Sequence, residues 1–167
     1  LVITVDCGST AFEPIAWAQE NGIDVIVTDH HLTKDEGLPN AFAVVNPNQP
    51  DCKYPDKNLA GVGVAFKLAH ALLREKGKEK IVNGFLKVVA IGTIADIMRL
   101  TGENRAIVKI GLQDLSQAKN FGLKALMEVA DCRSEMTSYH IGFRIAPRIN
   151  AAGRMDVARQ VVELFEA

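Results

Sequence analysis

The chain has 167 residues, of which 48% are hydrophobic and 23% are charged, and its formal net charge is −1. This composition is typical of a soluble globular domain with a core of ordinary size, and it excludes a disordered chain. The net charge gives no overall attraction to nucleic acid or to an anionic membrane, although a neutral total can contain a local basic patch.

The cysteines and the apolar runs bear on whether the protein is disulfide-rich, zinc-binding or membrane-spanning. Cys7, Cys52 and Cys132 are far apart and form no CxxC pattern. Their odd number favours reduced thiols in a cytoplasmic protein over a disulfide framework or a zinc site. No apolar run reaches the roughly 18 residues of a membrane span, so no membrane partner is expected.

Two apolar strands are predicted near the start of the chain, and each ends on a carboxylate. Leu1–Val5, a core strand, leads into Asp6, and Ile23–Thr28 leads into Asp29-His30-His31. A helix between them, capped at Ser9 or Thr10, completes a βαβ unit, so the strands are expected to be parallel neighbours. Their carboxyl ends then lie side by side, where α/β sheets bind ligands. A solvated turn is the alternative interpretation of the polar run.

The next part of the chain is predicted to hold a third strand and a helix. Ala41–Val45 is the strand, and after a long loop the helix begins at Asn58 and ends at Gly77. Gly61 and Gly63 in its first turns weaken the helix, which indicates that some group approaches the backbone closely there.

A helix over Asn83–Met98 is apolar nearly all round and is expected to be buried. Asp96 near its end is the exception. A buried carboxylate needs a hydrogen-bonding or cationic partner, or it becomes protonated. A metal ion is one such partner, and a capping role at the next element is the alternative.

Helical periodicity predicts that the rest of the chain is helical. The expected helices are Asn104–Ser116, Gly122–Ala130, Ser138–Arg144 and a last one from Asp156. The third is expected to stop at Pro147, because proline disfavours helical geometry in the residue before it. The pattern predicts an α/β fold, with a parallel-sheet βαβ core followed by a mainly helical portion.

The candidate site combines carboxylates with imidazole. Asp6, Asp29, His30 and Asp96 suit Mn²⁺ or Mg²⁺ better than structural zinc. Such an ion lowers the pKa of bound water by many units and neutralises charge on a phosphoryl oxygen. His31 beside it can donate to a phosphate or stabilise the charge that develops there.

Residues 144–159 form a locally cationic segment, with Arg144, Arg148, Arg154 and Arg159 against the single acid Asp156. Guanidinium groups bind phosphate bidentately, and Asn150 can hydrogen-bond it. Gly153 would let the backbone approach such a ligand. A solvated arginine-rich turn is the alternative interpretation.

Six blocks of the sequence, in this order, resemble the DHH phosphoesterase superfamily. They are Val5-Asp6-Cys7-Gly8, Thr28-Asp29-His30-His31, Val45-Asn46-Pro47, 59–67 (LAGVGVAFK), Gly92-Thr93-Ile94-Ala95-Asp96 and 147–154 (PRINAAGR). Within the superfamily they are most similar to the RecJ-type single-stranded-DNA-specific 5′→3′ exonucleases. The triplet Asp-His-His alone would be weak support for this family, whereas six blocks in the same order are strong support.

The resemblance implies a two-metal phosphodiesterase that depends on Mn²⁺ or Mg²⁺. It implies that Asp6 bridges both ions, that His30 and Asp96 complete one site, and that Asp29 orients the ligands. His31 would face the scissile phosphate. The residues implied to hold the nucleic-acid backbone are Arg148, Asn150 and Arg154. The implied partners are single-stranded DNA and, in the whole protein, a single-stranded-DNA-binding protein and a helicase.

Three departures from the family pattern follow from the same resemblance. An Asp-x-Asp strand that should precede Leu1 is missing, and so is a second, DHHA1-type domain. Residues 1–155 are therefore expected to be a DHH catalytic domain without its N-terminal strand, and 156–167 the start of a connecting helix. Alone, the chain is expected to bind Mn²⁺ weakly and to be inactive. Met98-Arg99 replaces an expected apolar residue and proline.

Two other functions remain open. One is a DHH phosphodiesterase or phosphatase acting on short oligonucleotides or cyclic dinucleotides, which the RecJ-like block Asn150-Ala151-Ala152-Gly153-Arg154 disfavours. The other is a non-catalytic replication scaffold of DHH ancestry, which the retention of Asp6, His30 and Asp96 disfavours.

Overall fold

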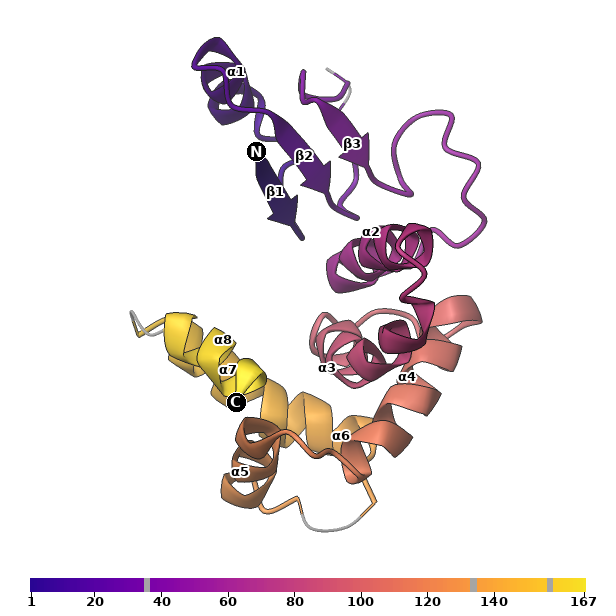
Figure 1. Ribbon diagram of the computed structural model, residues 1–167, viewed down its shortest axis with the longest axis vertical. Helices are drawn as coiled ribbons and strands as arrows, with labels where there is room; N and C mark the ends of the chain where they lie inside the picture. The colour runs from indigo at the N-terminus through magenta and orange to yellow at the C-terminus, as the bar shows by residue number, and fades with distance from the viewer. Residues whose placement is uncertain (35–36, 133–134, 156–157) are drawn as a thin grey trace. The chain divides into compact units, whose positions relative to one another are not determined.

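The computed structural model describes residues 1–34, 37–132, 135–155 and 158–167 (Figure 1). They form two compact units, Leu1–Val82 with Met98–Asn104 and Asn83–Ile97 with Arg105–Ala167. The elements are, in order, β1 (Val2–Val5), α1 (Phe12–Glu20), β2 (Val25–Thr28), β3 (Ala43–Val45), α2 (Gly61–Glu75), η1 (Glu79–Phe85), α3 (Leu86–Ala95), α4 (Gly102–Ser116), α5 (Phe121–Val129), α6 (Ser138–His140), η2 (Ile141–Ile145), α7 (Ala146–Gly153) and α8 (Ala158–Glu166). Among the described helices, none is long and apolar enough to cross a membrane.

A sheet of three parallel strands, in the order β1-β2-β3, forms the base of the first unit. Val2 pairs with Val25, and Ile26 pairs with Ala43. The three arrowheads in Figure 1 point the same way, and α2 lies beyond the carboxyl ends of the strands. The predicted parallel βαβ core is confirmed, and so is the helical character of the rest of the chain.

The core of the first unit lies between β2 and α1. Val25 and Val27 of β2 are buried and pack with Ile15 and Ala18 of α1. Alternating apolar side chains on a strand that is flanked by two others explain this burial. The prediction that β1 is a core strand is wrong. It is an edge strand of the described sheet, and the side chains of Val2, Ile3 and Val5 are about half exposed.

Two predicted helix starts in the first unit are also wrong. Neither Ser9 nor Thr10 caps α1, which follows Ala11 without a side-chain cap. The helix predicted from Asn58 begins at Gly61, because the Asn58 N–H donates to Asp56 and its carbonyl accepts from Asn104 instead of entering a helix. Gly77, with φ 65°, follows the end of this helix as predicted.

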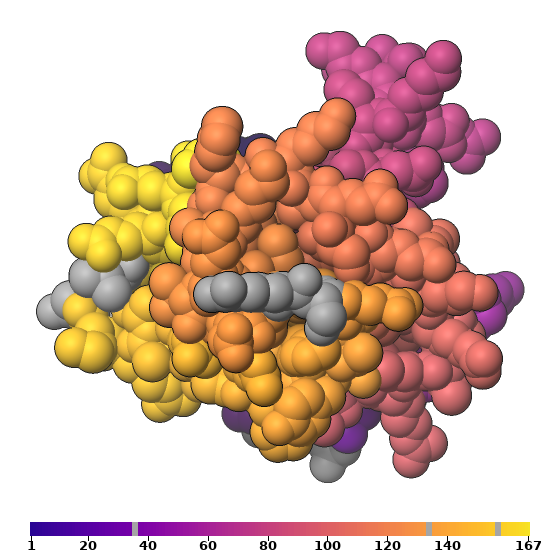
Figure 2. Space-filling model, turned by 90° about the horizontal axis from the view of Figure 1, so that it is seen from below, coloured from indigo at the N-terminus to yellow at the C-terminus, as the bar shows by residue number. Residues whose placement is uncertain are grey.

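The second unit is a helical bundle built around α3. As predicted, this apolar helix is buried. The side chain of Ile91 on α3 packs with those of Leu115, Leu123, Ile141 and Ile145. Met127 packs against the same core, as expected for a packing residue. The C-terminal residues of α8 (yellow) lie beside the orange residues of α5 in Figure 2, in agreement with the contacts between these helices. The predicted start of the last helix at Asp156 lies outside the described residues.

The helix predicted to stop at Pro147 continues to Gly153 through α6, η2 and α7. The π-helical turn η2 lies directly before the proline, and Ala146 keeps helical angles (φ −58°, ψ −41°). Proline lacks an N–H and clashes with the carbonyl four residues earlier, which usually breaks a helix. A wider π turn just before the proline accommodates this defect. The segment Arg148–Gly153 is therefore helical.

Candidate metal centre

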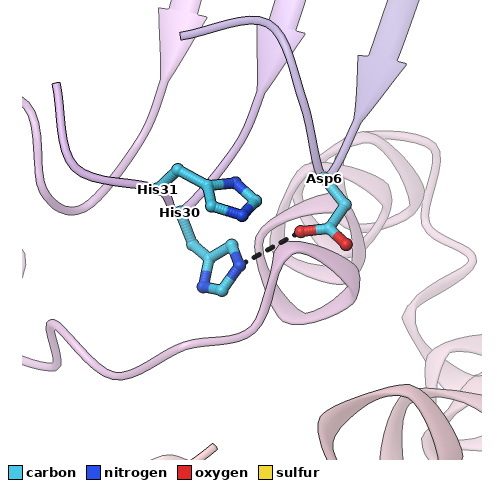
Figure 3. Close-up of side chains that lie close together, drawn as sticks. All are labelled: Asp6, His30 and His31. Atoms are coloured by element: carbon cyan, nitrogen blue, oxygen red, sulfur yellow. Dashed lines mark ion pairs between the residues drawn. The ribbon is translucent and has the colours of Figure 1, made fainter. Parts of the chain in front are cut away.

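Asp6, His30 and His31 lie together at the carboxyl ends of β1 and β2, as the parallel topology predicts (Figure 3). His30 Nε2 is 3.1 Å from Asp6 Oδ1, and the two imidazole centroids are 4.5 Å apart. One donor atom from each side chain lies within 4.8 Å of the others. Ligand atoms that share one Mg²⁺-sized ion at about 2.1 Å are roughly 3 Å apart. Small side-chain rotations would close the cluster around a divalent cation.

Asp6 is held at the end of β1 by its backbone. Its N–H donates to the Thr28 carbonyl at 2.9 Å, which extends the pairing with β2 into the turn. Its φ of 62° lies in the left-handed region, which aspartate tolerates better than most residues. A Cβ added at Gly61 would lie 2.6 Å from Asp6 Cα. The close approach predicted at this glycine is therefore the first turn of α2 packing on Asp6.

Asp29 does not lie in the cluster but beneath it, and it is 2% exposed. Its carboxylate accepts hydrogen bonds from the backbone N–H groups of Ser9 (2.9 Å), His30 (2.8 Å) and His31 (3.2 Å). The Nδ1 of His31 is 2.7 Å away. Burial disfavours the charged form, but hydrogen bonds, first from the Ser9 backbone and then from His31, outweigh it and hold the pKa of Asp29 well below its usual range. Asp29 is therefore a buried anion that organises the turn.

The contact with Asp29 also sets the chemistry of His31. A carboxylate that accepts from the ring requires the proton on Nδ1, which makes Nε2 the lone-pair nitrogen of a neutral imidazole. The His31 side chain is 60% exposed, whereas that of His30 is 9% exposed. The accessible Nε2 of this neutral ring suits a metal ion, whereas a ring that is also protonated at Nε2 would donate to a phosphate.

Replacing Asp29 by asparagine is expected to lower the free energy of unfolding by about 2–3 kcal/mol, because an amide NH₂ would face buried N–H donors. The folded pKa of Asp29 lies below the unfolded value of about 3.9, so its stabilisation is fully present above that pH, declines below it and is lost as the pH falls through the folded pKa. Urea unfolding at pH 7 and pH 3 should show a deficit that shrinks in acid. The exposed Asp24→Asn is the control, and an equal effect of both variants would contradict this assignment.

Two asparagines to which the sequence assigned no role in the site also position it, although Asn46 lies in one of the family-like blocks. Asn46 is buried, and its Nδ2 donates to Ser9 Oγ (2.8 Å) and to the His31 carbonyl (2.9 Å). Asn48 Nδ2 donates to the His30 carbonyl at 2.6 Å. Both follow β3, the third parallel strand, so the strand-end rule that located Asp6 also applies to them.

The long loop after β3 is fixed by charged side chains. Lys57 Nζ donates to the carbonyls of Pro47 (2.6 Å) and Cys52 (2.7 Å). Farther along, Glu103 accepts from both the Tyr54 hydroxyl and the Lys67 ammonium. Burial lowers the pKa of Lys67, but the contacts with Glu103 and Tyr54 outweigh burial and raise it overall. These contacts hold the loop that carries Asn46 against α2.

Asp96 departs from its predicted environment. It caps the C-terminus of α3, its N–H donates to the Gly92 carbonyl at 2.9 Å, and its side chain is exposed. The argument from a buried carboxylate is therefore wrong, because the helix has already left the core at Ala95. Asp96 belongs to the second unit, whereas Asp6 and His30 belong to the first. Its role as a ligand stays a prediction.

The predicted phosphate-binding residues Arg148, Asn150 and Arg154 are all exposed and lie on or directly after α7 of the second unit. Arg148 Nη1 donates to the Arg144 carbonyl at 2.6 Å, and Arg154 Nε donates to Asn150 Oδ1 at 3.3 Å. A Cβ at Gly153 would meet no atom within 4 Å, so its backbone is accessible. All three residues belong to the second unit, and their role in binding phosphate stays a prediction.

Not every residue of the cationic segment remains available to a phosphate. Arg144 Nη1 donates to the Asp131 carbonyl at 2.8 Å and lies 3.8 Å from its carboxylate. Arg159 pairs with Glu163 at 2.9 Å on α8. Cys7, Cys52 and Cys132 are free thiols, and their reduced state stays a prediction.

Comparison with known proteins gives consistent matches. Residues 1–93 match the family model described as "DHH family, N-terminal domain". Over 166 residues the chain is 48% identical to the single-stranded-DNA-specific exonuclease RecJ of Bacillus subtilis (strain 168), in a match that covers 99% of this chain and 20% of that protein.

Solved structures give the same result. The crystal structure of RecJ in complex with Mn²⁺ from Thermus thermophilus superposes with a TM-score of 0.85 at 39% identity, over 99% of this chain and 25% of that one. The structure of RecJ in complex with Mg²⁺ from the same organism gives a TM-score of 0.72 at 34% identity, over 99% and 22% of the two chains. The chain thus spans about a fifth to a quarter of the length of these relatives.

Proposed function

The chain belongs to the DHH family, and from that premise we propose that it forms the metal-binding part of an exonuclease that degrades single-stranded DNA from 5′ to 3′. The observation that carries the proposal is the cluster of Asp6, His30 and His31 at the carboxyl edge of the sheet. Relatives at 39–48% identity are named single-stranded-DNA-specific exonucleases, and structures of the one from Thermus thermophilus are described as complexes with Mn²⁺ and with Mg²⁺. Both findings support a nuclease that depends on one of these ions.

In this proposal Asp6 and His30 hold the ion, and Asp96 completes its coordination. One carboxylate and one imidazole fit an ion that prefers oxygen but accepts nitrogen, as Mn²⁺ does. The bound ion supplies a water of lowered pKa and neutralises charge on a phosphoryl oxygen. Asp29 fixes the orientation of His31, and His31, protonated at Nε2 as well, donates to the scissile phosphate.

The second unit contributes the substrate surface. Arg148 and Arg154 bind phosphates of the DNA backbone, and Asn150 holds Arg154 through its side-chain oxygen. The whole protein then acts in DNA recombination and repair in the cytoplasm, a reducing compartment that suits its free thiols. A single-stranded-DNA-binding protein and a helicase are its proposed partners.

The test is digestion of DNA by the full-length protein that contains this chain. With Mn²⁺ present, we expect release of mononucleotides from long single strands, little digestion of duplex or dinucleotide, and no digestion in EDTA. Blocking one strand end at a time reports the polarity. Asp96→Ala is expected to slow digestion on the order of 10²–10³-fold, as for loss of one electrostatic contact in an active site. The exposed Asp114→Ala in the same unit is the matched control.

Each other outcome has a definite meaning. An unchanged rate for Asp96→Ala would remove this residue from the metal site. Faster hydrolysis of dinucleotides than of long strands would identify a phosphodiesterase of short oligonucleotides. Absence of both Mn²⁺ binding and digestion would favour the non-catalytic scaffold.

A further inference from the structure

Two aromatic rings are exposed side by side on the helical segment 138–153. Tyr139 is 57% exposed and Phe143 is 71% exposed. Their ring centroids are 5.0 Å apart with planes tilted by 30°. Large apolar side chains gathered at a surface usually mark a place where another molecule binds. Flat rings open to solvent are the surface on which nucleobases stack.

The π-helical turn η2 aligns this pair with the arginine segment. Positions four apart on a regular α-helix drift by about 40° at each step, whereas a π turn has more residues per turn and absorbs that drift. As a result the buried positions Ile141 and Ile145 stay on one side. The exposed positions that continue along the other side are Tyr139, Phe143, Pro147, Asn150, Ala151 and Arg154, and the exposed Arg148 lies at the edge of this face.

The charge of this face fits an anionic polymer. Between Ser138 and Arg154 there are three arginines and no aspartate or glutamate. Arg144 is engaged by Asp131, but within the described ranges Arg148 and Arg154 have only oxygens of uncharged groups as partners. Within residues 1–34, 37–132, 135–155 and 158–167, no carboxylate pairs with either guanidinium group. The segment rises about 22 Å from Tyr139 to Arg154, the length of several stacked nucleotides at about 3.4 Å each.

We propose that single-stranded DNA lies along this face, with one or two bases stacked on Tyr139 and Phe143 and the neighbouring phosphates on Arg148 and Arg154. The inference rests on the proposed function and adds a base-stacking subsite to it. Every base has a π face, so the subsite binds bases without reading their sequence. Its specificity is for strands whose bases are unpaired, because bases inside a duplex are not available for stacking on a protein ring.

The test compares two strands that differ only in their bases. Binding of the full-length protein to oligothymidylate of about 15 nucleotides, and to an abasic strand of equal length, is measured by fluorescence anisotropy with divalent metal omitted. For the variant with both Tyr139→Ala and Phe143→Ala, the Kd for oligothymidylate should rise roughly 5- to 100-fold. The Kd for the abasic strand should stay within about twofold, because the phosphate contacts are intact.

Three control variants define the outcome. Phe143→Trp keeps a stacking ring and should retain binding. Phe121→Ala removes an equally exposed ring elsewhere in the same unit and should change nothing. Arg148→Ala should weaken binding of both strands alike. Circular dichroism melting confirms that each variant is folded.

The inference is overturned if the double variant loses affinity for both strands equally, or for neither. It is also overturned if the rings change the oligomeric state instead of DNA binding, since a second copy would then cover them. The proposed function has its own readout, which is Mn²⁺-dependent digestion by the unaltered protein. Base-dependent binding without digestion would reject the proposed function and keep the base-stacking subsite. Digestion without base-dependent binding would keep the proposed function and reject the subsite.

Discussion

Replacing His30 by glutamine is expected to lower the Mn²⁺-dependent digestion rate on the order of 10³-fold and to weaken Mn²⁺ binding with it. The side chain of His30 is 9% exposed and its Nε2 lies 3.1 Å from Asp6 Oδ1, close enough for both side chains to bind the same metal ion. Titration of the full-length protein with Mn²⁺, followed by electron paramagnetic resonance, gives the affinity beside the rate. His70→Gln, on α2 and 3.2 Å from Glu79, is the matched control.

His31 distinguishes two roles that the geometry allows. Its Nδ1 contacts Asp29, and its ring also lies among the possible metal ligands. If His31 faces the phosphate, His31→Ala should slow digestion on the order of 10²-fold and leave Mn²⁺ affinity almost unchanged. We expect this result. A parallel loss of Mn²⁺ affinity would make His31 a third ligand, and an unchanged rate would exclude it from both roles.

The part of the site that could be predicted depends on local rules. Two apolar strands joined by a helix require parallel pairing, and parallel pairing places Asp6 beside His30 without any knowledge of the rest of the fold. Asn46 and Asn48 also follow a parallel strand, but their role was missed because they bind the carbonyls of His30 and His31. Every residue has a carbonyl, so a position at a strand end does not show which carbonyl needs a donor.

The errors in the second unit have a different origin. Pro147 cannot make the normal hydrogen bond of an α-helix, as the local rule states. The helix nevertheless continues through a π turn, because Ile141 and Ile145 are packed in the core. The burial of Asp96 was inferred from its apolar neighbours, but an apolar helix does not specify where its last residue emerges. In both cases packing between elements outweighs the preference of a short segment.

A methyl group at Gly61 should damage the site without altering any functional side chain. A Cβ there would lie 2.6 Å from the Cα and Cβ of Asp6, so either α2 or the end of β1 must move. A displacement of about 1 Å at a catalytic group can reduce the rate roughly 10²-fold, and overpacking costs about 1–3 kcal/mol of stability. We therefore expect Gly61→Ala to lower both the digestion rate and the unfolding midpoint in urea.

Gly63→Ala separates this steric effect from a general effect of alanine in the helix. Both glycines are buried in the first turn of α2, but a Cβ at Gly63 would meet Leu59 at 3.4 Å, an ordinary contact, so the close approach predicted there is wrong. Alanine is favoured over glycine in a helix by up to about 1 kcal/mol, so Gly63→Ala should keep full activity and be as stable as the unaltered protein or more so. Equal behaviour of the two variants would mean that the contact between α2 and Asp6 does not position the carboxylate. A loss confined to Gly61→Ala would show that the metal centre depends on how closely a helix backbone approaches the end of a strand.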